Sequence, residues 1–134
     1  MSITKGIAHV ALKVPQSKFD DVVKFYMDVF EFTIKRKGGE GADAAVQLNS
    51  GNGVALEIFA NAPENLAADS VVAHIGLWVE DLDVACDRIK AAGGTVTLPP
   101  IEHSMPTTPP VPVRLSFFRG LAGELIEIYY EYGE

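Results

Sequence analysis

Two histidines and two glutamates recur at matched places in the sequence, and they are the side chains best suited to chemistry. His9 and Glu57 lie in the first half of the chain, and His74 and Glu127 lie in the second half. Two imidazoles and two carboxylates form a donor set that suits a borderline divalent ion. We therefore predict one divalent metal ion per site, nickel or zinc first, with cobalt, manganese or iron as alternatives.

The same four residues have a second interpretation. A single His or Glu on a strand is more often a surface residue or a satisfied polar neighbour than a ligand, and two separate His–Glu salt bridges would give the same pattern. Recurrence of both residue types in both halves favours the metal, because a buried pair of carboxylates without a cation is costly.

The alternation of polar and apolar residues predicts that all four side chains lie on the sheet face opposite the helices. Residues 7–14 alternate with period two, so His9 points away from the apolar side of its strand. The last strand of the first half alternates in the same way, so Glu57 also points away from the apolar side. The second half repeats both patterns around His74 and Glu127. If the first and last strands are neighbours, about 4.8 Å apart, each His stands beside a Glu.

The two halves repeat one order of elements. Ala-His-Val-Ala-Leu-Lys-Val at 8–14 matches Ala-His-Ile-Gly-Leu-Trp-Val at 73–79, 65 positions later, in four of seven residues. Val-Ala-Leu-Glu-Ile-Phe at 54–59 matches Glu-Leu-Ile-Glu-Ile-Tyr at 124–129, 70 positions later. We predict an α+β fold in which two βαβββ modules form a curved mixed sheet around a concave metal site.

Local signals predict where the elements begin and end. Ser17 is the expected N-cap of the first helix, Asn52-Gly53 is a hairpin turn, and Asp81 caps a second helix that stops at a Gly-Gly pair near residue 92. The predicted strands are 7–14, 31–37, 44–49 and 54–60 in the first module and 72–79, 95–98, 112–119 and 124–130 in the second, with a Pro-rich loop from Pro99 to Pro112.

At 134 residues the chain has the length of one domain. We predict a single domain, 1–134, composed of module 1 (5–60), a linker (61–70) and module 2 (71–131). Halves of this size bury little surface alone and have free sheet edges, so we predict a homodimer. The pattern leaves open whether one site is built within one chain or shared across the dimer.

The charge and the apolar content exclude several classes of partner. A net charge of −7 gives no basic surface for nucleic acid or anionic lipid. No apolar run approaches the roughly 20 residues of a membrane-spanning helix. The start of the chain has no apolar signal segment, and a lone cysteine, Cys86, cannot form an internal disulfide. We therefore predict a cytoplasmic protein with a small-molecule substrate, and Cys86 as a core residue.

The doubled pattern with His, Glu, His and Glu at these places resembles the vicinal oxygen chelate superfamily of glyoxalases, bleomycin-resistance proteins and extradiol dioxygenases. Segment 17–32, with Phe-Tyr and then Val-Phe-Glu-Phe, is similar to the superfamily's first helix and its "FY…VLGF" ending. Segment 118–127 is similar to its "DPDGxxIE" close. The resemblance covers nearly the whole chain.

Glu57 makes the ligand set most similar to that of glyoxalase I, lactoylglutathione lyase. Methylmalonyl-CoA epimerases generally carry Gln there, fosfomycin-resistance enzymes and extradiol dioxygenases use two His and one Glu, and bleomycin-binding members use no metal. Asn61 matches a position that glyoxalase I uses to hold glutathione, and Lys13 stands where bacterial glyoxalase I often has Arg. The resemblance thus implies substrate contacts at Lys13 and Asn61.

The implied activity is a metal-dependent conversion of a hemithioacetal, formed from a 2-oxoaldehyde and a thiol, to a 2-hydroxyacyl thioester. Proton transfer through a metal-bound enediolate would use Glu127 as first-choice base and Glu57 as its symmetric counterpart. Two alternatives stay open: another enzyme on the same scaffold, either a methylmalonyl-CoA-type epimerase or a fosfomycin-type epoxide transferase, and a non-enzymatic module that binds a drug or metabolite.

Overall fold

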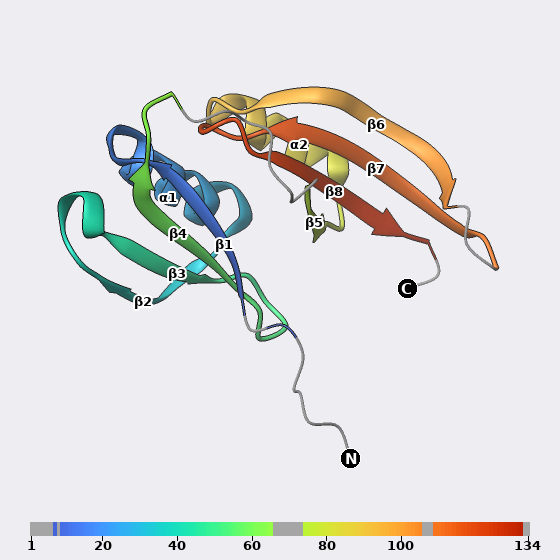
Figure 1. Cartoon of the computed structure of the whole chain (residues 1–134). Helices are drawn as coiled ribbons and strands as arrows, with labels where there is room; N and C mark the ends of the chain where they lie inside the picture. Colours follow the sequence, from blue (N-terminus) through green and yellow to red (C-terminus); the bar gives the residue numbers. More distant parts are fainter. Residues whose placement is uncertain (1–6, 8, 66–73, 106–108, 133–134) are drawn as a thin grey trace, which may run out of the picture. The chain divides into compact units, whose positions relative to one another are not determined.

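The chain divides into two compact units, Met1–Leu66 and Ala67–Glu134, which run from blue to green and from yellow to red in Figure 1. The computed structural model describes residues 7, 9–65, 74–105 and 109–132. Unit 1 contains β1 (His9–Pro15), α1 (Gln16–Phe30), β2 (Thr33–Gly38), a short 3₁₀ turn η1 (Gly41–Asp43), β3 (Ala45–Asn49) and β4 (Ala55–Ala62). Unit 2 contains β5 (Ile75–Trp78), α2 (Leu82–Ala91), β6 (Thr95–Met105), β7 (Val111–Arg119) and β8 (Leu125–Glu131).

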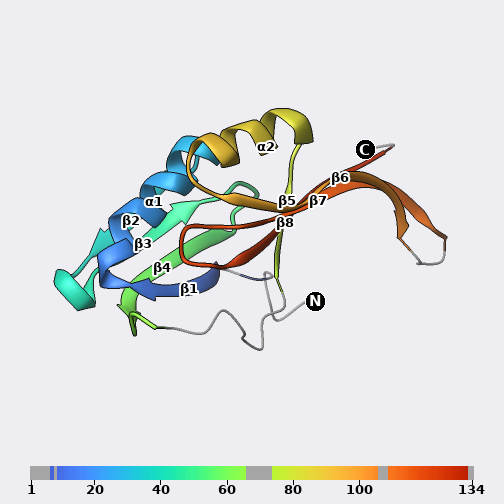
Figure 2. The same ribbon diagram turned by 90° about the horizontal axis from the view of Figure 1, so that it is seen from above.

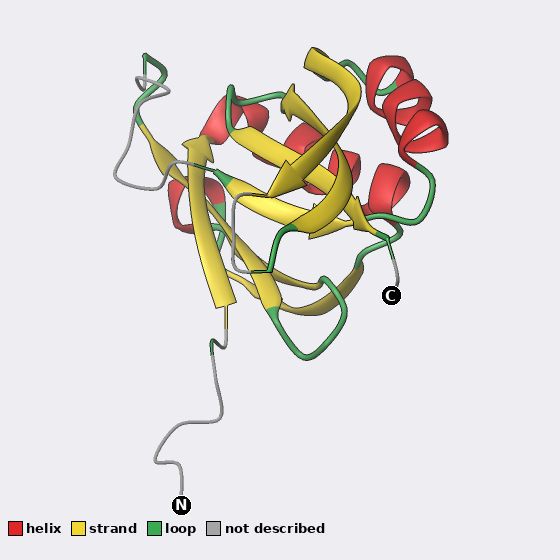
Figure 3. Cartoon of the chain, turned by 90° about the vertical axis from the view of Figure 1, so that its right-hand side faces the viewer, coloured by secondary structure: helices red, strands yellow, loops and turns green. Residues whose placement is uncertain are grey.

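Each unit forms a four-stranded mixed sheet with the same topology. The strand orders are β1-β4-β3-β2 and β5-β8-β7-β6. In both sheets the first strand runs parallel to the last one, and the other neighbours are antiparallel. Figure 3 separates these strands, in yellow, from the helices, in red. The predicted α+β fold of two βαβββ modules is confirmed, including the adjacency of first and last strands.

One helix covers one face of each sheet, and the opposite face carries the polar residues of interest. The helix α1 packs on β1 and β4, and α2 packs on β6, β7 and β8 (Figure 2). Apolar residues of the last strands lie under these helices, with Ile58 in unit 1 and Ile128 in unit 2 both fully buried. Because side chains alternate along a strand, Glu57 and Glu127 lie on the face away from the helix.

The starts of the two helices differ. Asp81 caps α2 as predicted, since its Oδ1 accepts a hydrogen bond from the Val84 backbone N–H at 3.1 Å. The predicted Ser17 cap is wrong: α1 begins at Gln16 directly after Pro15 and has no side-chain cap. The Pro15 ring fixes φ near −58°, which lets the helix start two residues earlier than expected. Ser17 Oγ instead donates to Glu64 at 2.8 Å.

The predicted loop after residue 98 is in large part a strand. The strand β6 continues to Met105, so the loop prediction is wrong for Pro99–Met105, and residues 106–108 lie outside the described residues. Two register shifts, at Val96/Leu98 and Leu98/Ile101, adjust the pairing near Pro99 and Pro100. An edge strand tolerates proline because the absent N–H is not needed on its outer side.

The strand β4 also extends beyond its predicted end. It includes Asn61 and Ala62, which the sequence analysis assigned to the linker. The predicted hairpin before it is present, with Asn52 at φ 53° and the Val54 N–H donating to the Gly51 carbonyl at 3.2 Å. The predicted linker residues 66–70, residues 5, 6 and 8 of module 1 and residues 71–73 of module 2 lie outside the described residues.

Candidate functional site

In unit 1, the parallel pairing of β1 with β4 brings His9 next to Glu57. Ala11 is the register partner of Glu57, so Glu57 stands two positions along the ladder from His9, on the same face. His9 Nε2 and Glu57 Oε1 are 3.6 Å apart. Residues 48 positions apart in the sequence therefore meet on one side of the sheet.

Unit 2 repeats this arrangement at the matching positions. Gly76 is the register partner of Glu127, and His74 again stands two positions before that partner, immediately ahead of β5. His74 Nε2 and Glu127 Oε1 are 3.4 Å apart. We refer to His9 with Glu57, and to His74 with Glu127, as the two His–Glu pairs.

The exposure and spacing of the two His–Glu pairs fit metal ligation. The glutamate side chains are 16% and 19% exposed, whereas the imidazoles are 45% and 38% exposed. Two ligand atoms bound to one ion at about 2.1 Å each lie roughly 3.0 to 3.4 Å apart, close to the nitrogen-to-oxygen separations seen here. Nitrogen and oxygen donors also match a borderline divalent ion.

Each unit brings one imidazole and one carboxylate together. In the described part of the chain, no three His, Cys, Asp or Glu side chains group together in a way that could hold a metal ion.

The two carboxylates have different neighbours on the adjacent strand. In unit 1, Gln47 of β3 is the register partner of Glu57, and its Nε2 donates to Glu57 Oε2 at 2.8 Å. In unit 2, Phe117 of β7 occupies the matching place, and its ring meets the His74 ring edge-on at a centroid distance of 5.3 Å. Gln47 is not among the predicted site residues, although the period-two alternation of strand 44–49 indicates its face.

The two predicted substrate contacts lie on the strands that carry the His–Glu pair of unit 1. Lys13 is exposed on β1, on the same face as His9, and is the register partner of Phe59. Asn61 is exposed on β4 beside the register shift between Lys13 and Pro15, so alternation from Glu57 does not determine its face. Their contact with a substrate stays a prediction.

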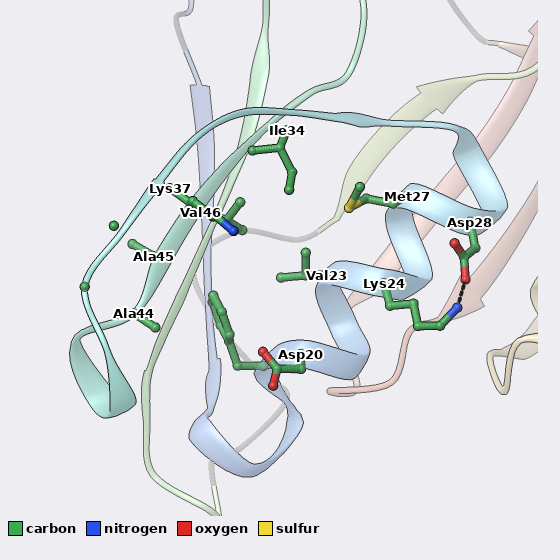
Figure 4. Close-up of a pocket in the computed structure, with 13 residues that line it drawn as sticks. Asp20, Val23, Lys24, Met27, Asp28, Ile34, Lys37, Ala44, Ala45 and Val46 are labelled. Atoms are coloured by element: carbon green, nitrogen blue, oxygen red, sulfur yellow. Dashed lines mark hydrogen bonds and ion pairs between the residues drawn. The ribbon is translucent and has the colours of Figure 1, made fainter.

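A hollow of about 630 Å³ in unit 1 lies away from these residues, between α1 and the strands β2 and β3. Figure 4 shows Val23 and Met27 of the helix facing Ile34 and Val46 of the strands. Lys24 and Asp28 pair with each other at its rim. No predicted ligand lines this hollow, so in unit 1 this hollow and the His–Glu pair are separate features.

Arg114 of β7 belongs to an ionic cluster in unit 2 rather than to a His–Glu pair. Its guanidinium lies 3.1 Å from Asp83 and 3.6 Å from Glu102, and the hydrogen bond to Asp83 raises the pKa of Arg114. The Tyr132 hydroxyl donates to Glu102 at 2.8 Å, and this hydrogen bond raises the pKa of Tyr132.

Cys86 lies in the core of unit 2. Its thiol is buried, with Sγ 3.5 Å from the Ser116 hydroxyl. The residue therefore packs as predicted.

Comparison with known proteins decides the family. The model of the Glyoxalase/Bleomycin resistance protein/Dioxygenase superfamily matches residues 6–128. The chain belongs to this superfamily. A curated relative, the probable lactoylglutathione lyase of Vibrio cholerae serotype O1, is 29% identical over an alignment of 137 positions. The alignment covers 91% of this chain and 88% of the relative.

Solved structures of the superfamily share the fold. A glyoxylase/bleomycin resistance protein/dioxygenase domain from Frankia sp. EAN1pec has a TM-score of 0.74 at 20% identity, covering 98% of this chain and 96% of that one. The FosX fosfomycin resistance protein of Listeria monocytogenes has a TM-score of 0.69 at 17% identity, covering 96% and 94%. A point mutant of FosX, which was solved with Mn(II) and a dihydroxypropylphosphonic acid, has a TM-score of 0.70 at 17% identity, covering 94% and 90%.

Neither α1 nor α2, the helices of the described residues, has the length and apolar character needed to cross a bilayer.

Proposed function

We propose that this chain is a metal-dependent lyase of glyoxalase I type, which converts the hemithioacetal of a 2-oxoaldehyde and a thiol to a 2-hydroxyacyl thioester. The observation that carries this proposal is the repeated His–Glu pair, with the same register in both units and nitrogen-to-oxygen separations of 3.6 and 3.4 Å. The name of the Vibrio cholerae relative supports the same activity.

The two His–Glu pairs would together hold one divalent ion, nickel or zinc, within one chain or across a homodimer. When bound, such an ion acts as a Lewis acid that polarises the substrate oxygens and acidifies the neighbouring C–H bond. Both pairs are needed because each unit supplies one imidazole and one carboxylate.

In this proposal Glu127 is the base. It takes the proton from one carbon of the hemithioacetal and returns it to the adjacent carbon. Glu57 accepts a hydrogen bond from Gln47, which holds its second oxygen in place, whereas Phe117 stands beside Glu127 and donates no such bond. The carboxylate that is held in place suits a fixed ligand, and the other suits a group that must move a proton.

Other residues would bind the substrate and exclude water. Lys13 and Asn61 would contact the thiol portion. Phe59, Trp78 and Tyr129 lie on the same faces as the two His–Glu pairs and would shield the reacting carbons from solvent.

The test is thioester formation, followed by absorbance, with methylglyoxal and glutathione as substrates and nickel-loaded or zinc-loaded protein. Bacillithiol and coenzyme A serve as further thiols. Glu127→Gln should lower kcat by at least about 100-fold, since general base catalysis contributes roughly that much or more. Glu57→Gln should weaken metal binding but recover most of its turnover at saturating metal. His103→Ala, at an exposed position of β6 outside the two His–Glu pairs, is the control and should leave turnover unchanged.

Two outcomes overturn parts of the proposal. If metal-loaded protein gives no rate above the buffer blank with any thiol, the lyase activity is wrong, and epimerase and epoxide-transferase assays follow. If turnover is present but Glu127→Gln leaves kcat unchanged, the base is another residue.

A further inference from the structure

The second unit has an aromatic hollow beside its His–Glu pair. It has a volume of about 580 Å³ and is lined by Trp78, Val79, Glu80, Tyr129, Tyr130 and Glu131. Trp78 is 64% exposed, which is unusual for so large an apolar surface. Its ring meets that of Tyr129 at a centroid distance of 6.2 Å and an angle of 67°, so the two rings form an open corner.

This hollow lies near the His74–Glu127 pair. Trp78 is the register partner of Tyr129, and Gly76 is the partner of Glu127, so the two features lie on one face, roughly 7 Å apart along the strands. A methyl group at Gly76 would lie 3.2 Å from Cε1 of Tyr129 and 3.6 Å from Oε1 of Glu127. The phenol ring and the carboxylate therefore meet above this glycine.

The charge around the hollow is negative. Glu80 and Glu131 contribute two carboxylates, and among the described residues none that lines the hollow is basic. Arg114 is the register partner of Tyr130, but its guanidinium is bound to Asp83 and Glu102. Aromatic faces combined with carboxylates attract a cation and disfavour an anion.

We propose that this hollow binds an organic ammonium group, held by cation–π contact with Trp78 and Tyr129 and by attraction to Glu80 and Glu131. A ligand with its ammonium group here would direct the rest of the molecule toward His74 and Glu127. That last step rests on the proposed function, and it specifies the substrates as thiol adducts that carry an ammonium group.

The test uses metal-free protein and two probes of the same shape, choline and its uncharged analogue 3,3-dimethyl-1-butanol. Isothermal titration calorimetry should give saturable choline binding at least roughly threefold tighter than that of the alcohol, the range that a cation–π contact supplies. Trp78 is the only tryptophan of the chain, so its emission should change with choline along the same saturation curve.

Variants separate the aromatic and the charge contributions. Trp78→Leu should abolish choline binding, whereas Trp78→Phe should retain part of it because an aromatic face remains. The double change Glu80→Gln with Glu131→Gln should weaken choline binding and leave the alcohol unaffected. Asp87→Asn, an exposed carboxylate on α2 outside the hollow, is the control for the change in net charge.

The proposal is overturned if choline and the alcohol bind equally, if neither binds saturably, or if Trp78→Leu binds choline as well as the unchanged protein. None of these measurements involves turnover or a metal. A failed lyase assay therefore leaves the ammonium site intact, and a failed choline titration leaves the lyase proposal intact.

Discussion

The two units carry the same His–Glu pair on the same strands but surround it differently. Gln47 in unit 1 donates a hydrogen bond to Glu57, whereas Phe117 at the matching place in unit 2 contacts the ring of His74. A repeated fold thus determines where the four side chains stand, while the residue on the neighbouring strand determines how firmly each carboxylate is held.

A second difference lies two positions further along each pair of strands. Lys13 faces Phe59 across β1 and β4, whereas Trp78 faces Tyr129 across β5 and β8. Unit 1 therefore offers a cation at this place, and unit 2 offers aromatic surface. One repeated module can in this way present two chemically different surfaces at matching positions.

Removal of either imidazole should have the largest effect on metal binding. Because the two His–Glu pairs have the same register, His9→Ala and His74→Ala should each lower nickel affinity by more than about 100-fold, beyond the effect of losing an outer partner of a ligand. Calorimetric titration with nickel measures this, and elemental analysis gives the bound metal. If one variant binds nickel like the unchanged protein, its His–Glu pair is a salt bridge and not a metal site.

The hydrogen bond that distinguishes the units should have the next largest effect. Gln47→Leu should lower nickel affinity by about 10-fold, the loss typical of a partner that orients a ligating carboxylate. Phe117→Leu should stay within about twofold, since Phe117 donates no hydrogen bond to Glu127. Both are measured by the same titration, with circular dichroism to show that the fold is intact. Equal losses in the two variants would contradict the asymmetry.

The helix starts provide a comparison of stability. Asp81→Ala removes the cap of α2 and should lower the free energy of unfolding by about 1 kcal/mol. Ser17→Ala should change it by less than about 0.5 kcal/mol, because α1 uses no side-chain cap. Urea unfolding followed by circular dichroism measures both. A Ser17→Ala loss as large as that of Asp81→Ala would contradict this and would show that Ser17 stabilises unit 1, for example through its exposed hydrogen bond to Glu64.

The smallest expected effect concerns Tyr132, which follows β8 in unit 2. Its hydrogen bond to Glu102 raises its pKa above the ordinary value of 10.0. The neutral phenol thus favours the fold, so its contribution is complete below about pH 10 and is lost as the pH rises through the raised pKa. The tyrosinate absorbance of the unchanged protein minus that of Tyr132→Phe should show this late ionisation. Glu102→Gln should lower the pKa of Tyr132 back toward 10.0.

The placement of the His–Glu pairs followed from the sequence because two independent patterns agreed. Alternation showed the face on which His9 and Glu57 lie, and the internal repeat showed that the second half reproduces it. The assumption that first and last strands are neighbours is confirmed by the sheet orders. Period-two alternation in the sequence matches the two faces of each sheet because one face is buried under a helix.

Other features depended on contacts that no local pattern contains. Gln47 reaches Glu57 because the two residues are register partners on β3 and β4. The hairpin that joins these strands determines the register, and the amino-acid composition does not. Pro99 and Pro100 are typical of a loop, yet the outer side of an edge strand accepts them. The Ser17 cap was displaced by Pro15, whose fixed φ starts the helix earlier.

The pairing of the first strand with the last also has a kinetic consequence. His9 and Glu57 are 48 positions apart, and closing so long a loop costs entropy that the helix and the hairpin between them help to offset. A partly synthesised chain therefore lacks each His–Glu pair until the last strand of its module has been made. Because the proposed metal site takes one pair from each unit, metal uptake would follow only after both last strands are present.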